Sequence, residues 1–229
     1  VINYYQQGNG TNSGLYEYSD NVGKIGHIYR SDILDSGGTT VSRSTTKYGS
    51  SNPVTGAYFV YPLQTVTESS GVNTAKEYTF NTTTGNLTDI VDHGIVTVST
   101  PLSFTDTGSD EKTTSYTYVT NGSGVYAVSD VSTFDQSSTK VNETKYYYDA
   151  QSFGALTDGN NTKIERLKTG STFLNTQKTF DTYGNVLTAT DERGKVTTYT
   201  YDTPNIHVAT VTNPLSQVKS YVYEYNTGN

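Results

Sequence analysis

What this sequence lacks excludes several kinds of chemistry. None of its 229 residues is a cysteine, so disulfides, cysteine-ligated zinc, iron–sulfur clusters and thiol nucleophiles are excluded. Methionine and tryptophan are absent as well, and the sequence has no long runs of the Ala, Leu, Glu and Lys residues that fill helix surfaces. We therefore expect almost no helix.

Positive charge and long apolar runs are also scarce. The 15 Lys and Arg residues are scattered singly among 22 Asp and Glu, and the formal net charge is −7. Contacts to phosphates need clustered basic residues, so we expect no nucleic-acid partner. No apolar run approaches the length of a membrane span. The start, Val1 to Tyr5, resembles neither an initiator nor a signal peptide, and we interpret the chain as an excerpt from a longer protein.

Threonine and tyrosine dominate what remains. The chain has 41 Thr and 21 Tyr, and only 32% of its residues are hydrophobic. Both residue types favour strands, and burial must come largely from aromatic rings and threonine methyl groups. The length suits a single all-β structural unit.

An internal repeat is visible in the C-terminal part of the chain. The spacing from Phe180 to Tyr201 is 21 residues, and from Tyr201 to Tyr223 it is 22. Tyr199 and Tyr201 alternate with threonines, which places the tyrosines on one face of a strand. We expect Tyr199, Tyr201, Tyr221 and Tyr223 to form a cross-strand aromatic ladder.

Turn chemistry follows each aromatic pair. Asp181 comes directly after Phe180, and Gly184 follows three residues later. An aspartate that bonds its own backbone and a glycine at positive φ predict a chain reversal, so each repeat is one antiparallel hairpin. We divide the chain into a divergent β-rich part, 1–77, and the repeats, 78–229. The predicted motif residues are Phe80, Gly85, Tyr146, Tyr148, Asp149, Phe180, Asp181, Gly184, Asn185, Tyr199, Tyr201, Asp202, Tyr221 and Tyr223.

This tyrosine–aspartate pattern with Gly-Asn turns resembles the RHS/YD-repeat family, which includes bacterial RHS proteins, B-type components of Tc insecticidal toxins and teneurins. Segments 4–10, 24–26, 144–149 and 211–215 carry the resemblance as well. It implies an antiparallel hairpin strip, a curved or spiralling sheet that is part of a larger shell. It also implies a secreted or surface scaffold of bacterial origin that encloses or displays a toxin or effector. The expected partners are the neighbouring repeats and the enclosed cargo of the parent polypeptide.

No catalytic or metal-binding pattern stands out. His27, His93 and His207 are far apart and lack metal-type spacing, so we interpret them as packing or surface residues. The pairs Asp110–Glu111 and Asp191–Glu192 are adjacent residues, which point to opposite faces of a strand and do not converge as glycosidase carboxylates. We expect no enzyme, cofactor or metal.

Two weaker signals are polar. Asp158-x-Asn160 matches only part of a calcium loop. The glycosylation sequons are frequent enough in this composition to arise by chance; they begin at Asn9, Asn81, Asn86, Asn121, Asn142 and Asn160.

Two functions compete. The first is a structural scaffold whose tyrosines face other protein. The alternative is an adhesin that binds carbohydrate on exposed tyrosines, because aromatic rings stack on sugars. Burial of Tyr199 and Tyr201 against protein favours the scaffold, and open rings in a groove favour adhesion.

Overall fold

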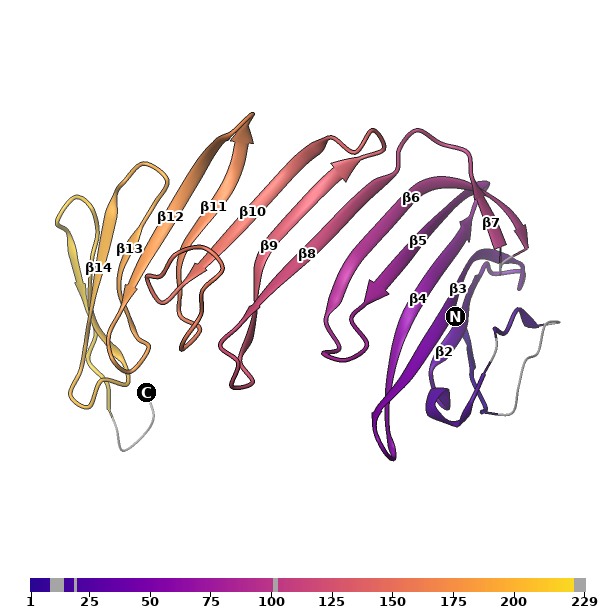
Figure 1. Ribbon diagram of the computed structural model, residues 1–229, viewed down its shortest axis with the longest axis horizontal. Coiled ribbons are helices and arrows are strands. Elements are labelled where there is room, and N and C mark those ends of the chain that lie inside the picture. The colour runs from indigo at the N-terminus through magenta and orange to yellow at the C-terminus, as the bar shows by residue number, and fades with distance from the viewer. Residues whose placement is uncertain (9–14, 19, 101–102, 225–229) are drawn as a thin grey trace. The chain divides into compact units, whose positions relative to one another are not determined.

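The computed structural model describes residues 1–8, 15–18, 20–100 and 103–224, without the side chains of residues 53 and 54. The sixteen strands of these residues form one antiparallel sheet (Figure 1). The expected all-β hairpin fold is confirmed. Within the same residues, no helix is long and apolar enough to cross a membrane. The sequon residue Asn9, and Gly10 of the segment 4–10, lie outside the described residues.

Strand order follows chain order. Each strand lies beside its neighbours in sequence, except that β7 pairs only with β6 and the order then continues from β6 to β8. A short 3-10 helix, η2, lies at Val22–Lys24. The strands are β1 (Ile2–Tyr5), β2 (Ile28–Leu34), β3 (Thr40–Val54), β4 (Ala57–Ser69), β5 (Val72–Phe80), β6 (Leu87–Thr100), β7 (Ser103–Asp106), β8 (Lys112–Thr120), β9 (Tyr126–Asp135), β10 (Lys140–Tyr148), β11 (Asn161–Thr169), β12 (Thr172–Phe180), β13 (Val186–Thr190), β14 (Val196–Tyr201), β15 (Val208–Thr212) and β16 (Val218–Ser220).

The first compact unit comprises Val1–Tyr116 and Thr133–Val141. Strands β3 to β6 lie side by side in it, in chain order (Figure 1). Its hydrophobic cluster is small: Val66 pairs in register with Ala75, and Val96 completes the buried set. The partly buried side chains of Val98 and Phe104 pack against this cluster.

The second compact unit comprises Thr117–Ser132 and Asn142–Asn229. Its buried cluster consists of Val119, Tyr148 and Leu156, against which Ala127 and Tyr146 pack. From β11 onward each strand pairs with the next along the chain. Burial in this unit therefore depends on two members of the predicted motif, Tyr146 and Tyr148.

One turn recurs between strands. It spans five residues. The backbone N–H of the first residue donates to the carbonyl of the fifth, and the N–H of the fourth residue donates to the carbonyl of the first. The side chain of the first residue accepts the N–H of the third and fifth residues. The fourth residue has positive φ, such as Gly184 at +85°. The prediction for Asp181 and Gly184 is thus confirmed. The first residues of these turns are Asp35, Asp135, Asp181, Asp191 and Asn213.

Tyrosine hydroxyl groups bond across neighbouring strands. Tyr201 donates to the carbonyl of Val186, the first residue of β13, at 3.0 Å. Tyr223 donates in the same way to Val208, the first residue of β15, at 3.1 Å. Tyr148 donates to Val128 in β9 at 2.7 Å. Tyr201 and Tyr148 thus connect the last residue of one strand to the strand before it, and Tyr223 does the same from the segment that follows β16.

The expected aromatic ladder is not formed as a set of ring contacts. Tyr221 and Tyr223 lie 6.5 Å apart, but among the described residues no ring contact joins either of them to Tyr199 or Tyr201. The two pairs are separated by β15. Next-but-one strands are about 9.6 Å apart, beyond the roughly 7 Å limit for paired rings. Tyr199 and Tyr201 are half-buried on one face, as the alternation predicts.

Asp149 organises the loop between β10 and β11. Its carboxylate accepts the backbone N–H of Thr157, Asp158, Gly159 and Asn160 at 2.8 to 3.1 Å. The backbone N–H groups of the partial calcium motif at 158–160 thus donate to the Asp149 carboxylate. Burial alone would raise the pKa of Asp149, but these four donors outweigh burial and lower the pKa.

Asp149→Ala is expected to destabilise the protein by about 2 kcal/mol, because four N–H groups lose a charged acceptor in a loop that solvent partly screens. Urea unfolding at pH 7 measures the loss, and Asp158→Ala, an exposed neighbour, should change stability by less than about 0.5 kcal/mol. Since the folded pKa is lowered, the contribution is present above the unfolded pKa of about 4 and disappears as pH falls below it. Equal losses for the two variants would contradict this role.

Candidate functional site

A β-bulge in β6 singles out His93. In the pairing of β5 with β6, Ala75 lies opposite Gly94 and Lys76 lies opposite Asp92, which leaves His93 as the extra residue. Gly94 takes a positive φ of +59°, and its N–H bonds to the Asp92 carboxylate at 3.2 Å. Because a bulge re-aims the side chain at the inserted position, His93 departs from the regular alternation of its strand.

Strand register brings two carboxylates to this bulge. Asp106, the last residue of β7, pairs with Val96 of β6. Lys112, the first residue of β8, pairs with Asp92. The chain between these strands must therefore pass the part of β6 that contains His93, and it places Glu111 beside the ring.

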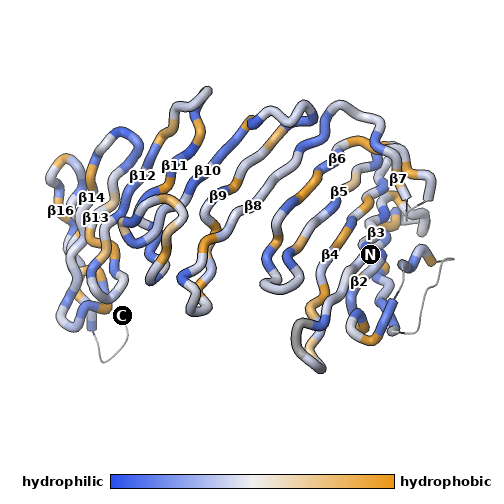
Figure 2. Tube along the Cα trace, viewed as in Figure 1, coloured by the Kyte–Doolittle hydropathy of each residue, from blue (hydrophilic) through white to orange (hydrophobic). Residues whose placement is uncertain are grey.

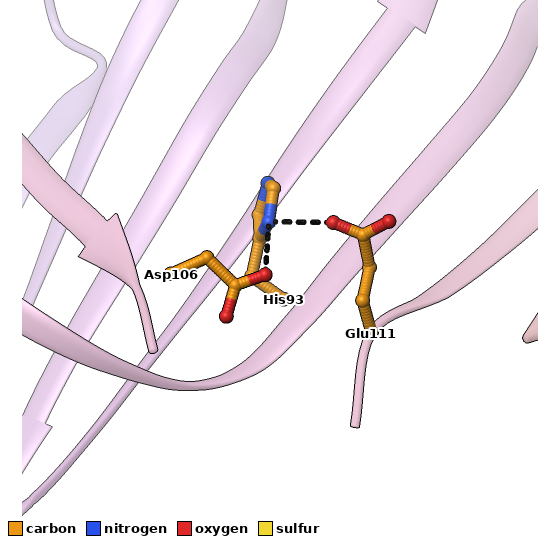
Figure 3. A group of neighbouring side chains, drawn as sticks. All are labelled: His93, Asp106 and Glu111. Atoms are coloured by element: carbon orange, nitrogen blue, oxygen red, sulfur yellow. Dashed lines mark ion pairs between the residues drawn. The ribbon is translucent and has the colours of Figure 1, made fainter. Parts of the chain in front are cut away.

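Both carboxylates face the same ring nitrogen. The Nδ1 atom of His93 lies 3.1 Å from Oε2 of Glu111 and 3.5 Å from Oδ2 of Asp106 (Figure 3). The other ring nitrogen, Nε2, lies 3.3 Å from Oε2 of Glu77 on β5. The His93 side chain is 12% exposed, and its ring packs on Phe104 with centroids 4.9 Å apart.

Nδ1 itself is buried and makes no hydrogen bond. Two oxygens lie within 3.5 Å, so distance is not the obstacle. The oxygens therefore lie to the side of the direction in which Nδ1 points, since a hydrogen bond requires near-linear geometry. A neutral ring also carries only one N–H and can serve only one of the flanking carboxylates as a donor.

Asp110 fixes the segment that carries Glu111. Its carboxylate accepts the N–H of Ile95 at 3.0 Å. A Cβ at Gly94 would lie 2.0 Å from this carboxylate, and one at Gly108 would lie 1.9 Å from it. A larger residue at either position would displace the Asp110 carboxylate, and at Gly94 it would also have to adopt the positive φ. Asp110 and Glu111 thus point different ways, as expected for adjacent residues, but Glu111 converges on a histidine.

An imidazole nitrogen with two carboxylate oxygens is a metal-ligand set, and the three ligand atoms lie within 4.8 Å of one another. Sequence analysis predicted a packing or surface role for His93 and opposite directions for the side chains of Asp110 and Glu111, and it did not bring His93 and Glu111 together. The sequence spacing did not indicate a metal site, because Asp106 follows His93 by 13 positions and Glu111 follows Asp106 by 5. Gly94 directly after His93 was the available signal of a bulge.

The other two histidines pack as expected. His27 contacts the Lys24 carbonyl through Nδ1 at 3.0 Å and the Tyr48 ring at 5.2 Å. His207 lies 4.5 Å from the Tyr223 ring and 3.3 Å from a carboxylate oxygen of Asp202.

The remaining motif residues occupy strand ends and turns. Asp202 accepts the N–H of Ile206 and His207, and Asn205 takes the positive φ in that turn. Asp191 of the second acidic pair is a turn residue. Phe80, Tyr146, Phe180, Tyr199 and Tyr201 lie in strands, whereas Gly85 lies between β5 and β6 with positive φ and Asn185 closes the Asp181 turn. Among described residues, these motif positions do not converge on one point.

No family model matches the chain, and no curated protein matches it. Solved structures give distant matches. A porin-like protein from Bacteroides uniformis is 13% identical, with 80% of this chain and 79% of that chain covered and a TM-score of 0.37. The TcdB2-TccC3-Cdc42 structure is 12% identical, with 87% and 11% covered and a TM-score of 0.41.

A Tc holotoxin pore from Photorhabdus luminescens is also 12% identical, with 88% of this chain and 11% of that chain covered and a TM-score of 0.41. The present chain spans about a tenth of the length of these Tc toxin chains. The neighbours thus include Tc toxin structures, the group that the sequence pattern resembles. TM-scores of this size carry no assignment of family or activity.

Proposed function

We propose that this chain is a section of β-hairpin scaffold in a larger secreted or surface protein of RHS type, which encloses or displays a toxin or effector. The strand order carries the proposal, because nearly all strands between β1 and β16 pair on both edges with the strands that precede and follow them in the chain; the exception is at β7, which pairs only with β6. In such an array, residues serve mainly to join one unit to the next. We propose a structural role for this chain and no enzymatic one.

The faces of the sheet support a structural role. Hydrophobic residues appear as short separate stretches along the strands rather than as continuous bands (Figure 2). Hydroxyl groups also pair across strands, as Thr179 does with Thr188 and Thr200 with Thr210, both at 2.7 Å. Half-buried faces of this kind suit contact with other parts of a parent polypeptide.

The adhesin alternative has less support. Tyr201 is half-buried, and its hydroxyl is bonded to Val186, so its ring is anchored in the sheet. Among the described residues, the most exposed ring belongs to Tyr183, at the tip of a turn, and is 73% exposed. Sugar-binding platforms need several open rings together.

A deletion of one whole repeat tests the scaffold. Removing residues 181–201 joins Phe180 to Asp202, so that β12 continues into the turn before β15. We expect the shortened chain to keep its β-type circular dichroism and cooperative unfolding, because each unit contacts only its neighbours. Removing 181–190 alone deletes a single strand and reverses every later strand, so we expect a clear loss of stability. Equal damage from both deletions would contradict the modular scaffold.

A second measurement separates the function classes. We expect the purified chain to show neither turnover of glycosidase and peptidase substrates nor saturable binding on a glycan array. Binding that is lost in Tyr183→Ala but not in the half-buried Tyr199→Ala would favour the adhesin. Turnover abolished by changing one Asp or Glu would favour an enzyme.

A further inference from the structure

We propose that His93, Asp106 and Glu111 bind a divalent transition-metal ion of the Zn²⁺ class, a site that goes beyond the scaffold role. The ligands come from β6, from the end of β7 and from the residue before β8. The ion would join three stretches of chain in the first unit (Figure 3).

The ligand spacing fits such an ion. Zinc lies about 2.0 to 2.2 Å from nitrogen and oxygen ligands, so neighbouring ligand atoms lie about 3.0 Å apart at a right angle and about 3.5 Å apart in a tetrahedron. The distances from Nδ1 to Glu111 and Asp106 are 3.1 and 3.5 Å. The third pair, the two carboxylate oxygens, lies within 4.8 Å, so an ion that binds all three ligands would draw these oxygens toward each other where they exceed the tetrahedral spacing.

The orientation of Nδ1 agrees with this placement. Nδ1 is buried without a hydrogen bond, and the two oxygens lie to the side of its lone-pair direction. An ion on that direction, flanked by both oxygens, would give the nitrogen the partner that the side chains do not.

Surrounding groups support the ligands. Glu77 faces the opposite ring nitrogen at 3.3 Å, the arrangement in which a carboxylate orients a metal-bound histidine. The other oxygen of Asp106 accepts the N–H of Gly108 at 3.1 Å, which leaves Oδ2 directed at His93. Both outer contacts hold the ligands in the geometry that an ion requires.

Charge favours a dication as well. Glu77, Asp106 and Glu111 bring three negative charges to one imidazole, and even a protonated ring supplies a single positive charge. Hard cations such as Ca²⁺ and Mg²⁺ prefer oxygen ligands throughout, whereas imidazole suits Zn²⁺ and its neighbours. Glu111 also lines an open depression, which gives the ion a path from solvent.

Calorimetric titration of the whole chain with ZnCl₂ tests the proposal. We expect one ion per chain, with Co²⁺ at the same site giving the visible absorption of a low-coordinate complex, and a higher urea midpoint that returns to its starting value with chelator. Asp106→Asn and Glu111→Gln, which keep side-chain size, should each weaken binding by more than about 100-fold, and Glu77→Gln, an orienting residue, by about 10- to 100-fold.

The matched control is His207→Ala, which removes a histidine that faces the Asp202 carboxylate in the second unit and should leave zinc binding unchanged. Circular dichroism of each variant establishes that it is folded. The proposal is wrong if the unaltered chain binds no Zn²⁺ or Co²⁺ at millimolar concentration. It is also wrong if folded Asp106→Asn and Glu111→Gln bind as tightly as the unaltered chain, or if Ca²⁺ binds there and Zn²⁺ does not displace it.

Discussion

Asp32→Asn is expected to destabilise the first unit by about 3 kcal/mol. Asp32 is 2% exposed and bonds to Arg30 beside it on β2 and to Arg43, its registered partner on β3. The Arg30 guanidinium also lies 4.4 Å from the centre of the Tyr4 ring. Removing the carboxylate leaves two poorly solvated cations side by side, and breaking a buried pair in this way costs about 3 to 5 kcal/mol.

Urea unfolding at pH 7 measures this loss, and Lys76→Gln is the control, because Lys76 and Asp92 form an exposed pair that should contribute less than about 1 kcal/mol. Hydrogen bonds from Arg30 and Arg43 hold the pKa of Asp32 well below its usual range despite burial. The folded pKa is lowered, so the contribution is present above about pH 4 and is lost only as pH falls far below that value. A loss no larger than that of the control would show that the cluster is solvated.

Tyr148→Ala is expected to cost about 4 kcal/mol in the second unit, the range for removing a large buried aromatic. Its side chain packs with Val119 and Leu156, and its hydroxyl donates to Val128. Tyr148→Phe keeps the ring and leaves one carbonyl without its donor, so we expect a loss of about 1 kcal/mol.

Two further tyrosines calibrate this result in the same unfolding assay. Tyr201→Ala should lose about 2 kcal/mol, because the ring is half-buried and only its hydroxyl is fixed. Tyr183→Ala removes an exposed ring and should stay within about 0.5 kcal/mol of the unaltered chain. If Tyr148→Ala matched Tyr183→Ala, the cluster around Leu156 would not be a core.

Local chemistry made the hairpins predictable. Asp181 and Gly184 determine their turn through contacts within a few residues, and the alternation at Tyr199 and Tyr201 is a property of one strand. The prediction of an aromatic ladder was wrong because ring contacts between repeats depend on how far apart the repeats lie. Repeats advance by two strands, and β15 lies between the rings that were expected to meet.

The His93 cluster required information that is not local. The bulge depends on how β5 and β6 are paired, and the approach of Asp106 and Glu111 depends on β6 pairing with both β7 and β8. Neither pairing follows from residue types at fixed spacing. The short distances between His93, Asp106 and Glu111 therefore follow only from the strand register in the structure.

Pairing between successive strands also affects how the chain acquires its fold. A hairpin joined by the Asp181 or Asp191 turn closes a very short loop, so little chain entropy is lost when its strands meet. Each finished hairpin then offers an edge to the strand that follows it. The strands can thus be added in the order of synthesis, and a strand need not wait for a distant part of the sequence before it pairs.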